Sequence, residues 1–116
     1  MKIIYNKLIP FPHFWAITIL NMIFVREEYR RLEGTPAEVV MINHESIHFE
    51  QEKELGFMFF YILYLLEWLV KLCFYGKKAY HNISFEREAY ANECDAEYLK
   101  KRKRYNWIKL IIRENI

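Results

Sequence analysis

Apolar and polar residues follow each other in blocks that predict a mostly helical chain with a small β element at its N-terminus. Two prolines in residues 3–12 exclude a helix there, so we expect an extended segment. The apolar run from Phe14 to Val25 is rich in β-branched and aromatic residues and breaks at Asn21, which predicts two short strands that form an antiparallel pair or small sheet. A single helix over the same run is the alternative, because short apolar runs do not separate the two structures.

The first long helix has clear boundary signals. Gly34 is followed by Thr35, which can cap a helix, and by Pro36, which fits the first helical position. The helix is expected to end near Leu55, because Gly56 follows it.

The next segment, Phe57–Tyr75, is apolar over almost its whole length. About 20 such residues can cross a bilayer. Glu67 and Lys71 count against a membrane span, since each charge near the bilayer centre costs about 2.5–3.5 kcal/mol. A small soluble domain also needs one helix that its neighbours bury on nearly all sides. We therefore expect a buried helix, and membrane association through residues 57–75 is the less favoured alternative.

A further helix is expected over residues 85–104, with Ser84 as its cap. Glu86 and Glu88 lie in its first turn, where the helix dipole favours anions. The basic run 100–104 lies in its last turn, where cations are favoured, so a solvated helix end explains this run better than a nucleic-acid site. An apolar tail over residues 107–112 is expected to dock on the body.

Composition supports a single α+β domain over residues 1–116. Hydrophobic residues make up 53% of the chain and aromatic residues 18%, with only three glycines and three prolines, which argues against disorder. A chain of 116 residues is long enough for one domain with its own core. The net charge of +2, from 17 basic and 15 acidic residues, argues against a dedicated nucleic-acid binder.

The two cysteines, Cys73 and Cys94, are far apart and form no C-x-x-C unit. We expect buried free thiols rather than a disulfide. Near the N-terminus, Asn6, Lys7 and Pro10 interrupt any apolar core of a signal peptide. A cytoplasmic location is therefore expected.

His44, Glu45 and His48 form the pattern H-E-x-x-H within the first long helix. Histidines four apart project from one helix face and can bind one divalent cation, typically zinc. Glu45 lies too far round the helix to be the natural third ligand, but it can reach a water as a general base. The same spacing also occurs in helices without a metal, where such histidines are hydrogen-bonded core residues, and this interpretation stays open.

A catalytic zinc usually has three protein ligands and one open position. His13, His81 and the acidic residues of the segment 85–93 are the candidates for the third ligand. Glu86 and Glu88 flank one face of the expected helix on opposite sides. Helix geometry alone therefore leaves both glutamates open.

The two motifs together resemble those of the gluzincin branch of zinc metallopeptidases, especially the minimal gluzincin domains and the IrrE/ImmA-like peptidases. The second motif of these families reads Glu-x-Glu/Gln-Ala-Asn/Asp, and residues 86–90 match it with Glu86 in the ligand position. Tyr90 departs from this pattern, because the families commonly carry Asn or Asp there. Starting the motif at Glu88 would restore the Asn and make Glu88 the ligand, but we prefer Glu86.

The resemblance implies a zincin-like, mostly helical domain with three main helices that hydrolyses peptide or protein substrates. It implies that His44, His48 and Glu86 bind one Zn²⁺ ion and that Glu45 is the catalytic base. An extended peptide is expected to lie along the strand near residues 23–26.

Tyr80, His81 and Tyr90 are the candidate donors to the oxyanion that forms during hydrolysis. The first alternative function is a catalytically silent zinc-binding domain, structural or regulatory, in which the motif joins two long helices. The second is a small membrane-associated protein anchored by residues 57–75.

Overall fold

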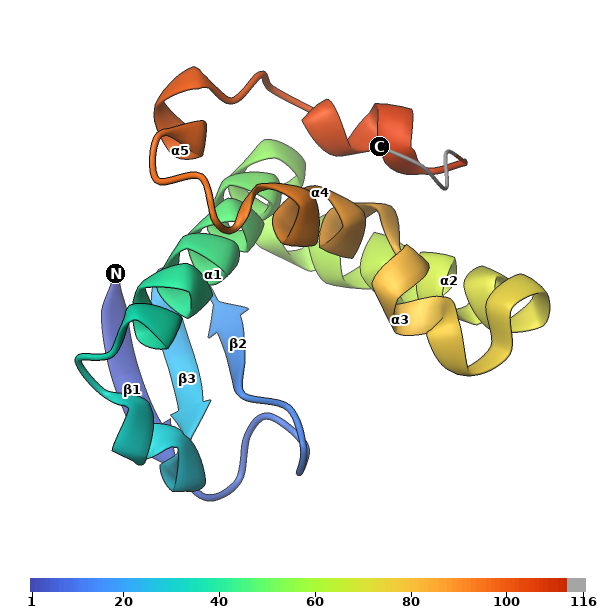
Figure 1. Ribbon diagram of the computed structural model, residues 1–116. Helices are drawn as coiled ribbons and strands as arrows, with labels where there is room; N and C mark the ends of the chain where they lie inside the picture. Colours follow the sequence, from blue (N-terminus) through green and yellow to red (C-terminus); the bar gives the residue numbers. More distant parts are fainter. Residues whose placement is uncertain (113–116) are drawn as a thin grey trace.

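The computed structural model describes residues 1–112 and has a mixed α+β fold in which 62% of the residues are helical (Figure 1). A three-stranded sheet forms one end of the molecule, and the helices cover it and extend away from it. The elements are β1 Lys2–Asn6, β2 Ala16–Ile19, β3 Met22–Arg26, the 3-10 helix η1 Glu27–Leu32, α1 Pro36–Leu55, α2 Phe57–Tyr75, η2 Gly76–Lys78, α3 Ala79–Asn82, α4 Ser84–Asn92, α5 Tyr98–Lys101 and η3 Asn106–Leu110.

The sheet contains the predicted pair of strands and one more. Strands β2 and β3 are antiparallel on either side of a turn at Leu20 and Asn21, as predicted. The extended N-terminal segment supplies β1, which pairs with β3 in parallel, so the sheet is mixed and its order is β1-β3-β2. Because β3 is the central strand, β2 is an edge strand.

Helix α1 has the predicted boundaries and packs against the sheet. Thr35 Oγ1 accepts a hydrogen bond from the backbone N–H of Glu38, and Pro36 is the first helical residue. Met41 is buried against Ile23 and Val25 of the central strand. This packing places the middle of α1 beside the edge strand β2.

Helix α2 has the predicted boundaries but not the predicted burial. Phe60 and Lys71 are its buried residues, whereas most of its large apolar side chains are exposed. By length and composition alone, the helical stretch that begins at Phe57 could cross a membrane, and 11% of its most apolar part is buried within the molecule. The expectation of a helix buried on all sides is therefore wrong, because the small body of the protein covers one face of it.

The predicted single helix over residues 85–104 is also wrong. Helix α4 ends at Asn92, and α5 begins after a turn. The side-chain amide of Asn43 donates to the backbone carbonyls of Asn92, Glu93 and Asp95 at 3.3, 2.7 and 3.0 Å. Asn43 of α1 thus satisfies backbone carbonyls at and just beyond the end of α4, which stabilises the break.

Two further details of this region differ from the prediction. Ser84 does not cap α4, since its backbone N–H and hydroxyl both donate to the carboxylate of Glu67. The basic run is not a solvated helix end throughout, because α5 ends at Lys101 and Arg102 turns inward to pair with Glu54.

The apolar tail docks on the body as predicted. Trp107 is buried against Phe85, with ring centroids 4.6 Å apart, and Leu110 is buried as well. Both cysteines are free, as expected, but Cys73 and Cys94 are exposed rather than buried.

Candidate metal centre

The candidate centre lies where α4 crosses the middle of α1 (Figure 1). Ile47 of α1 and Ala89 of α4 are fully buried in the same apolar cluster. The small side chain of Ala89 allows the two helices to approach closely. This approach brings a carboxylate of α4 to the histidines of α1.

Three side chains converge at this crossing. His44 Nε2 and His48 Nε2 are 3.2 Å apart, and Glu86 oxygens lie 3.1 Å from each of these nitrogens. All three residues are buried, and they form a group that could hold a metal ion. A tetrahedral ion with bonds of about 2.0–2.1 Å places its ligand atoms roughly 3.3–3.4 Å apart. The distance between the two imidazole nitrogens, and the distance from each nitrogen to its own oxygen of Glu86, are close to this spacing.

The outer nitrogen of His48 is fixed by a chain of buried hydrogen bonds. His48 Nδ1 lies 2.8 Å from Gln51 Oε1, and the amide of Gln51 donates to Phe85 O and Glu88 Oε1 at 3.0 and 2.9 Å. Since the Gln51 oxygen is an acceptor, His48 Nδ1 carries the hydrogen. Its Nε2 then faces the shared centre, where a cation can take the place of the proton on this nitrogen.

The other two members of the triad also have supporting partners. His44 Nδ1 lies 3.7 Å from Glu93 Oε1, within the range of an ion pair. The hydroxyl of Tyr64 donates to Glu86 Oε2 at 2.7 Å. Each of the three side chains is thus oriented by a contact outside the triad.

The alternative third ligand, Glu88, faces away from the histidines. Its carboxylate accepts hydrogen bonds from Gln51, Tyr98 and Arg102, and the side chain is fully buried. Glu88 therefore joins α4 to α5 and to the segment that follows it. The geometry favours the motif register in which Glu86 faces the histidines.

Glu45 lies beside the triad and is held in place by the edge strand. Thr18 Oγ1 of β2 lies 2.8 Å from Glu45 Oε1 and 3.1 Å from the backbone carbonyl of Glu45. The other carboxylate oxygen lies 3.9 Å from His44 Nε2. Burial raises the pKa of the Glu45 carboxyl above its ordinary value. A carboxylate with a raised pKa next to a metal site is suited to accept a proton.

The charges within the triad favour a bound cation. Burial alone would lower the pKa of His48, but the charge of Glu86 and its hydrogen bond outweigh burial and raise this pKa to about 10. For Glu86, burial raises the pKa, but the neighbouring His48 outweighs it, so the net pKa is well below its usual range. The pocket thus stabilises an ionised carboxylate beside a positive charge.

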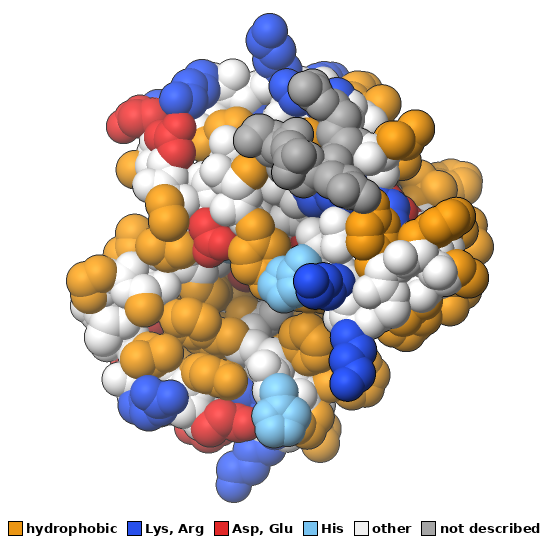
Figure 2. All heavy atoms as spheres, turned by 45° about the vertical axis from the view of Figure 1, so that its right-hand side comes forward, with side chains coloured by type: hydrophobic (Ala, Val, Ile, Leu, Met, Phe, Trp, Pro, Cys, Tyr) orange, Lys and Arg blue, Asp and Glu red, His pale blue; other side chains and the backbone are white. Residues whose placement is uncertain are grey.

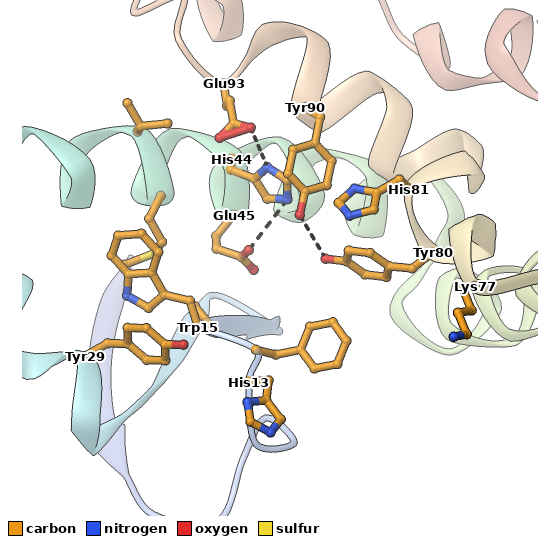
Figure 3. A pocket seen from close by; sticks show the side chains of 14 residues that line it. His13, Trp15, Tyr29, His44, Glu45, Lys77, Tyr80, His81, Tyr90 and Glu93 are labelled. Atoms are coloured by element: carbon orange, nitrogen blue, oxygen red, sulfur yellow. Dashed lines mark hydrogen bonds and ion pairs between the residues drawn. The ribbon is translucent and has the colours of Figure 1, made fainter. Parts of the chain in front are cut away.

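Two cavities adjoin the centre. The first, of about 550 Å³, is lined by His44 and Glu45 together with Trp15, Tyr80 and Tyr90 (Figure 3). The second, of about 410 Å³, is mostly apolar and reaches Glu45, His48 and Glu86 from the side of α2. Glu45 thus lines both cavities, and each cavity also reaches a member of the triad.

The remaining candidates from the sequence line the first cavity without joining the triad. His13 and His81 are exposed there. The ring of Tyr90 packs edge-on against His44 at 4.5 Å, and its hydroxyl lies 3.5 Å from that of Tyr80. Figure 3 shows the Tyr80 hydroxyl directed across the cavity toward Glu45.

Thr18 and Tyr64 contact the candidate centre but were not predicted from the sequence. They lie in elements with no motif, so no local signal could have identified them. Glu93 was among the acidic candidates for the third ligand, and the structure places it beside the outer nitrogen of His44 rather than in the triad.

Comparisons with models of protein families, with curated proteins and with solved structures gave no match. The resemblance to gluzincins therefore rests on the two motifs, and the candidate centre rests on its own geometry.

Proposed function

We propose that this protein is a zinc-dependent metallopeptidase. The observation that carries the proposal is the convergence of His44, His48 and Glu86, with Glu45 beside them at the wall of a cavity. These three residues would hold one zinc ion, and the donor set of two imidazoles and a carboxylate fits such an ion. When bound, zinc lowers the pKa of a water molecule and polarises a carbonyl group.

Glu45 has the position of a general base. It would take a proton from the attacking water and pass it to the leaving nitrogen of the cleaved amide. The hydrogen bond from Thr18 leaves the other carboxylate oxygen of Glu45 facing His44. Thr18 would act as a positioning residue, because it fixes the rotamer of Glu45.

The substrate peptide is expected to bind along β2. We expected from the sequence that it lies along residues 23–26. These residues belong to β3, which pairs with β1 and β2 on its two sides, so a peptide cannot add to the sheet there. The backbone N–H of Arg26 donates to the carbonyl of Trp15, so the backbone groups of Trp15 face β3. Backbone groups alternate in direction along a strand, and those of the next residue, Ala16, therefore point to the open edge of the sheet. Ala16 lines both cavities, which places this edge next to Glu45. An extended peptide could add to the sheet there.

Tyr80 is the preferred donor to the oxyanion. Its hydroxyl lies between that of Tyr90, 3.5 Å away, and the cavity, and it is directed toward Glu45 (Figure 3). Burial raises the pKa of Tyr80 far above its ordinary value, so the phenol stays protonated.

The proposal is tested with the Glu45→Gln variant, assayed on fluorescently labelled casein while its zinc content is measured. Gln cannot accept the proton but keeps the shape of the side chain, so we expect zinc to be retained and hydrolysis to fall by at least about 100-fold. Glu50→Gln is the matched control, since Glu50 lies on the same helix in a surface pair with Lys53. Full turnover in Glu45→Gln would contradict the role of the base.

A second candidate is a zinc-binding domain without turnover. It is favoured by one observation, namely that the triad joins α1 to α4 and so could stabilise their crossing. Bound zinc without hydrolysis by the unaltered protein would support this second function and reject the first.

A further inference from the structure

Helix α2 turns one stripe of side chains toward the protein. This stripe contains Phe60, Tyr64, Glu67, Lys71 and Tyr75, which are spaced three or four residues apart. Tyr64 reaches the candidate metal centre, where it bonds to the carboxylate of that site. Tyr61, beside this stripe, also hydrogen-bonds to the body, and most of the remaining helix surface is exposed.

Both charged residues of α2 lie in this inward stripe. The Glu67 carboxylate accepts hydrogen bonds from the backbone and the hydroxyl of Ser84. Lys71 is buried, donates to the backbone carbonyls of Asn82 and Ile111, and lies 3.4 Å from Glu67. The charges that counted against membrane contact in the sequence are thus absent from the outward face of α2.

The outward face is apolar along the whole helix, which is about 28 Å long. Figure 2 shows hydrophobic side chains gathered along the right-hand edge of the molecule. Six side chains of α2 are more than half exposed, namely Met58, Phe59, Leu65, Leu66, Val70 and Phe74. None of them offers a hydrogen-bond donor. A protein partner usually forms about ten hydrogen bonds across an interface, whereas lipid chains require none.

The loop between β1 and β2 adds exposed apolar side chains. Leu8 is 84% exposed and Phe11 is 79% exposed. Phe11 lines the apolar cavity together with Leu65 and Trp68 of α2, so the loop and the helix flank one opening. Trp68 is partly exposed there, and tryptophan favours the level of lipid headgroups.

Exposed lysines accompany both apolar segments. Lys77 and Lys78 directly follow α2, and Lys7 precedes Leu8. Within residues 1–112 none of these three lysines forms an ion pair. Unpaired lysines beside an apolar surface are complementary to anionic headgroups.

We propose that α2 binds to the surface of a lipid bilayer that contains anionic lipids. The helix lies in the interfacial plane, with its outward face among the acyl chains and with Lys77 and Lys78 at the headgroups. Its inward stripe stays packed on the protein, so α2 does not cross the bilayer. This inference depends on the surface of α2 and is independent of the proposed hydrolysis.

The test is flotation of the full chain with vesicles of phosphatidylcholine alone or mixed with phosphatidylglycerol. We expect the protein to float with both, and more strongly with the anionic vesicles. In the double variant Leu66→Asp/Val70→Asp, two exposed apolar side chains that the lipid would cover become charges, so vesicle binding is expected to fall about a hundredfold. Because both side chains are more than half exposed, thermal unfolding should show that the variant keeps its fold.

Val39→Asp is the matched control, because Val39 is 65% exposed on α1 and lies outside the proposed surface. This control should float like the unaltered protein. Failure of the unaltered protein to float, or undiminished flotation of the double variant, would overturn the proposal. Sedimentation without lipid tests whether a second copy of the chain binds this face instead. If the unaltered protein does not float but forms a dimer, and the double variant disrupts that dimer, the face is a dimer interface.

Discussion

Glu86 and Glu88 are two positions apart on α4, but their side chains have different partners. Two residues correspond to about 200° of helical rotation, so the side chains leave the helix on nearly opposite sides. Glu86 meets two imidazoles, whereas Glu88 meets the guanidinium of Arg102 and the hydroxyl of Tyr98. The carboxylate of Glu86 is therefore available to a metal ion, whereas that of Glu88 stabilises the fold through its bonds to Arg102 and Tyr98.

Glu52 is a further buried carboxylate, and it makes the stability of the protein depend on pH. Its side chain is fully buried and accepts a hydrogen bond from Tyr61, while Oε2 has no partner within the described residues. Burial raises the pKa of Glu52 from 4.5 to about 7. The folded state thus binds more protons than the unfolded state between these values, and the free energy of unfolding falls as the pH rises through this window.

We predict that Glu52→Gln removes this part of the pH dependence. The metal-free variant should be about 1–3 kcal/mol more stable than the metal-free unaltered protein at pH 8, and close to it near pH 4. Urea unfolding in the presence of a chelator at several pH values measures the difference. Equal slopes of stability against pH for the two proteins would show that Glu52 does not carry the effect.

Among the elements, the crossing of α1 and α4 decides whether the centre forms. Ala89 is fully buried in one cluster with Ile47 at this crossing, where a larger side chain would force the helices apart. Glu86 lies one turn before Ala89 on α4, so a displacement there would move its carboxylate away from His44 and His48.

Ala89→Leu is therefore expected to weaken zinc binding and to lower the free energy of unfolding by about 1–3 kcal/mol. Ala91→Leu makes the same change on the exposed side of α4 and should leave both quantities unchanged. Competition with a chromophoric zinc chelator measures the affinity. Equal zinc affinities for the two variants would mean that close helix packing is not required for the site.

The sequence predicted those elements whose boundaries are set by local signals. Thr35 and Pro36 determined the start of α1, and the H-E-x-x-H spacing identified two members of the triad. The end of α4 could not be predicted, because it depends on Asn43, about 50 residues earlier in the chain. The hydrogen bond from Tyr64 to Glu86 could not be predicted either, because it depends on how α2 packs against α4.

At the scale of the whole molecule, α2 connects the candidate centre to the apolar surface. Its inward stripe supplies Tyr64 to the triad, and its side chains Leu65 and Trp68 line the apolar cavity that reaches Glu86. The sequence could not show which face of this helix is covered, because Phe57–Tyr75 is apolar on nearly all sides. The inward direction of Glu67 and Lys71 follows from their partners in and beyond α3.

The proposed function depends on whether His44, His48 and Glu86 bind a metal ion together. The most direct measurement is the zinc content, by mass spectrometry, of protein purified without added metal, alongside the variants Glu86→Gln and Glu88→Gln. We expect one zinc ion per chain in the unaltered protein and in Glu88→Gln, and strongly reduced zinc in Glu86→Gln. An unaltered protein without zinc, or zinc lost from Glu88→Gln but retained in Glu86→Gln, would contradict this expectation.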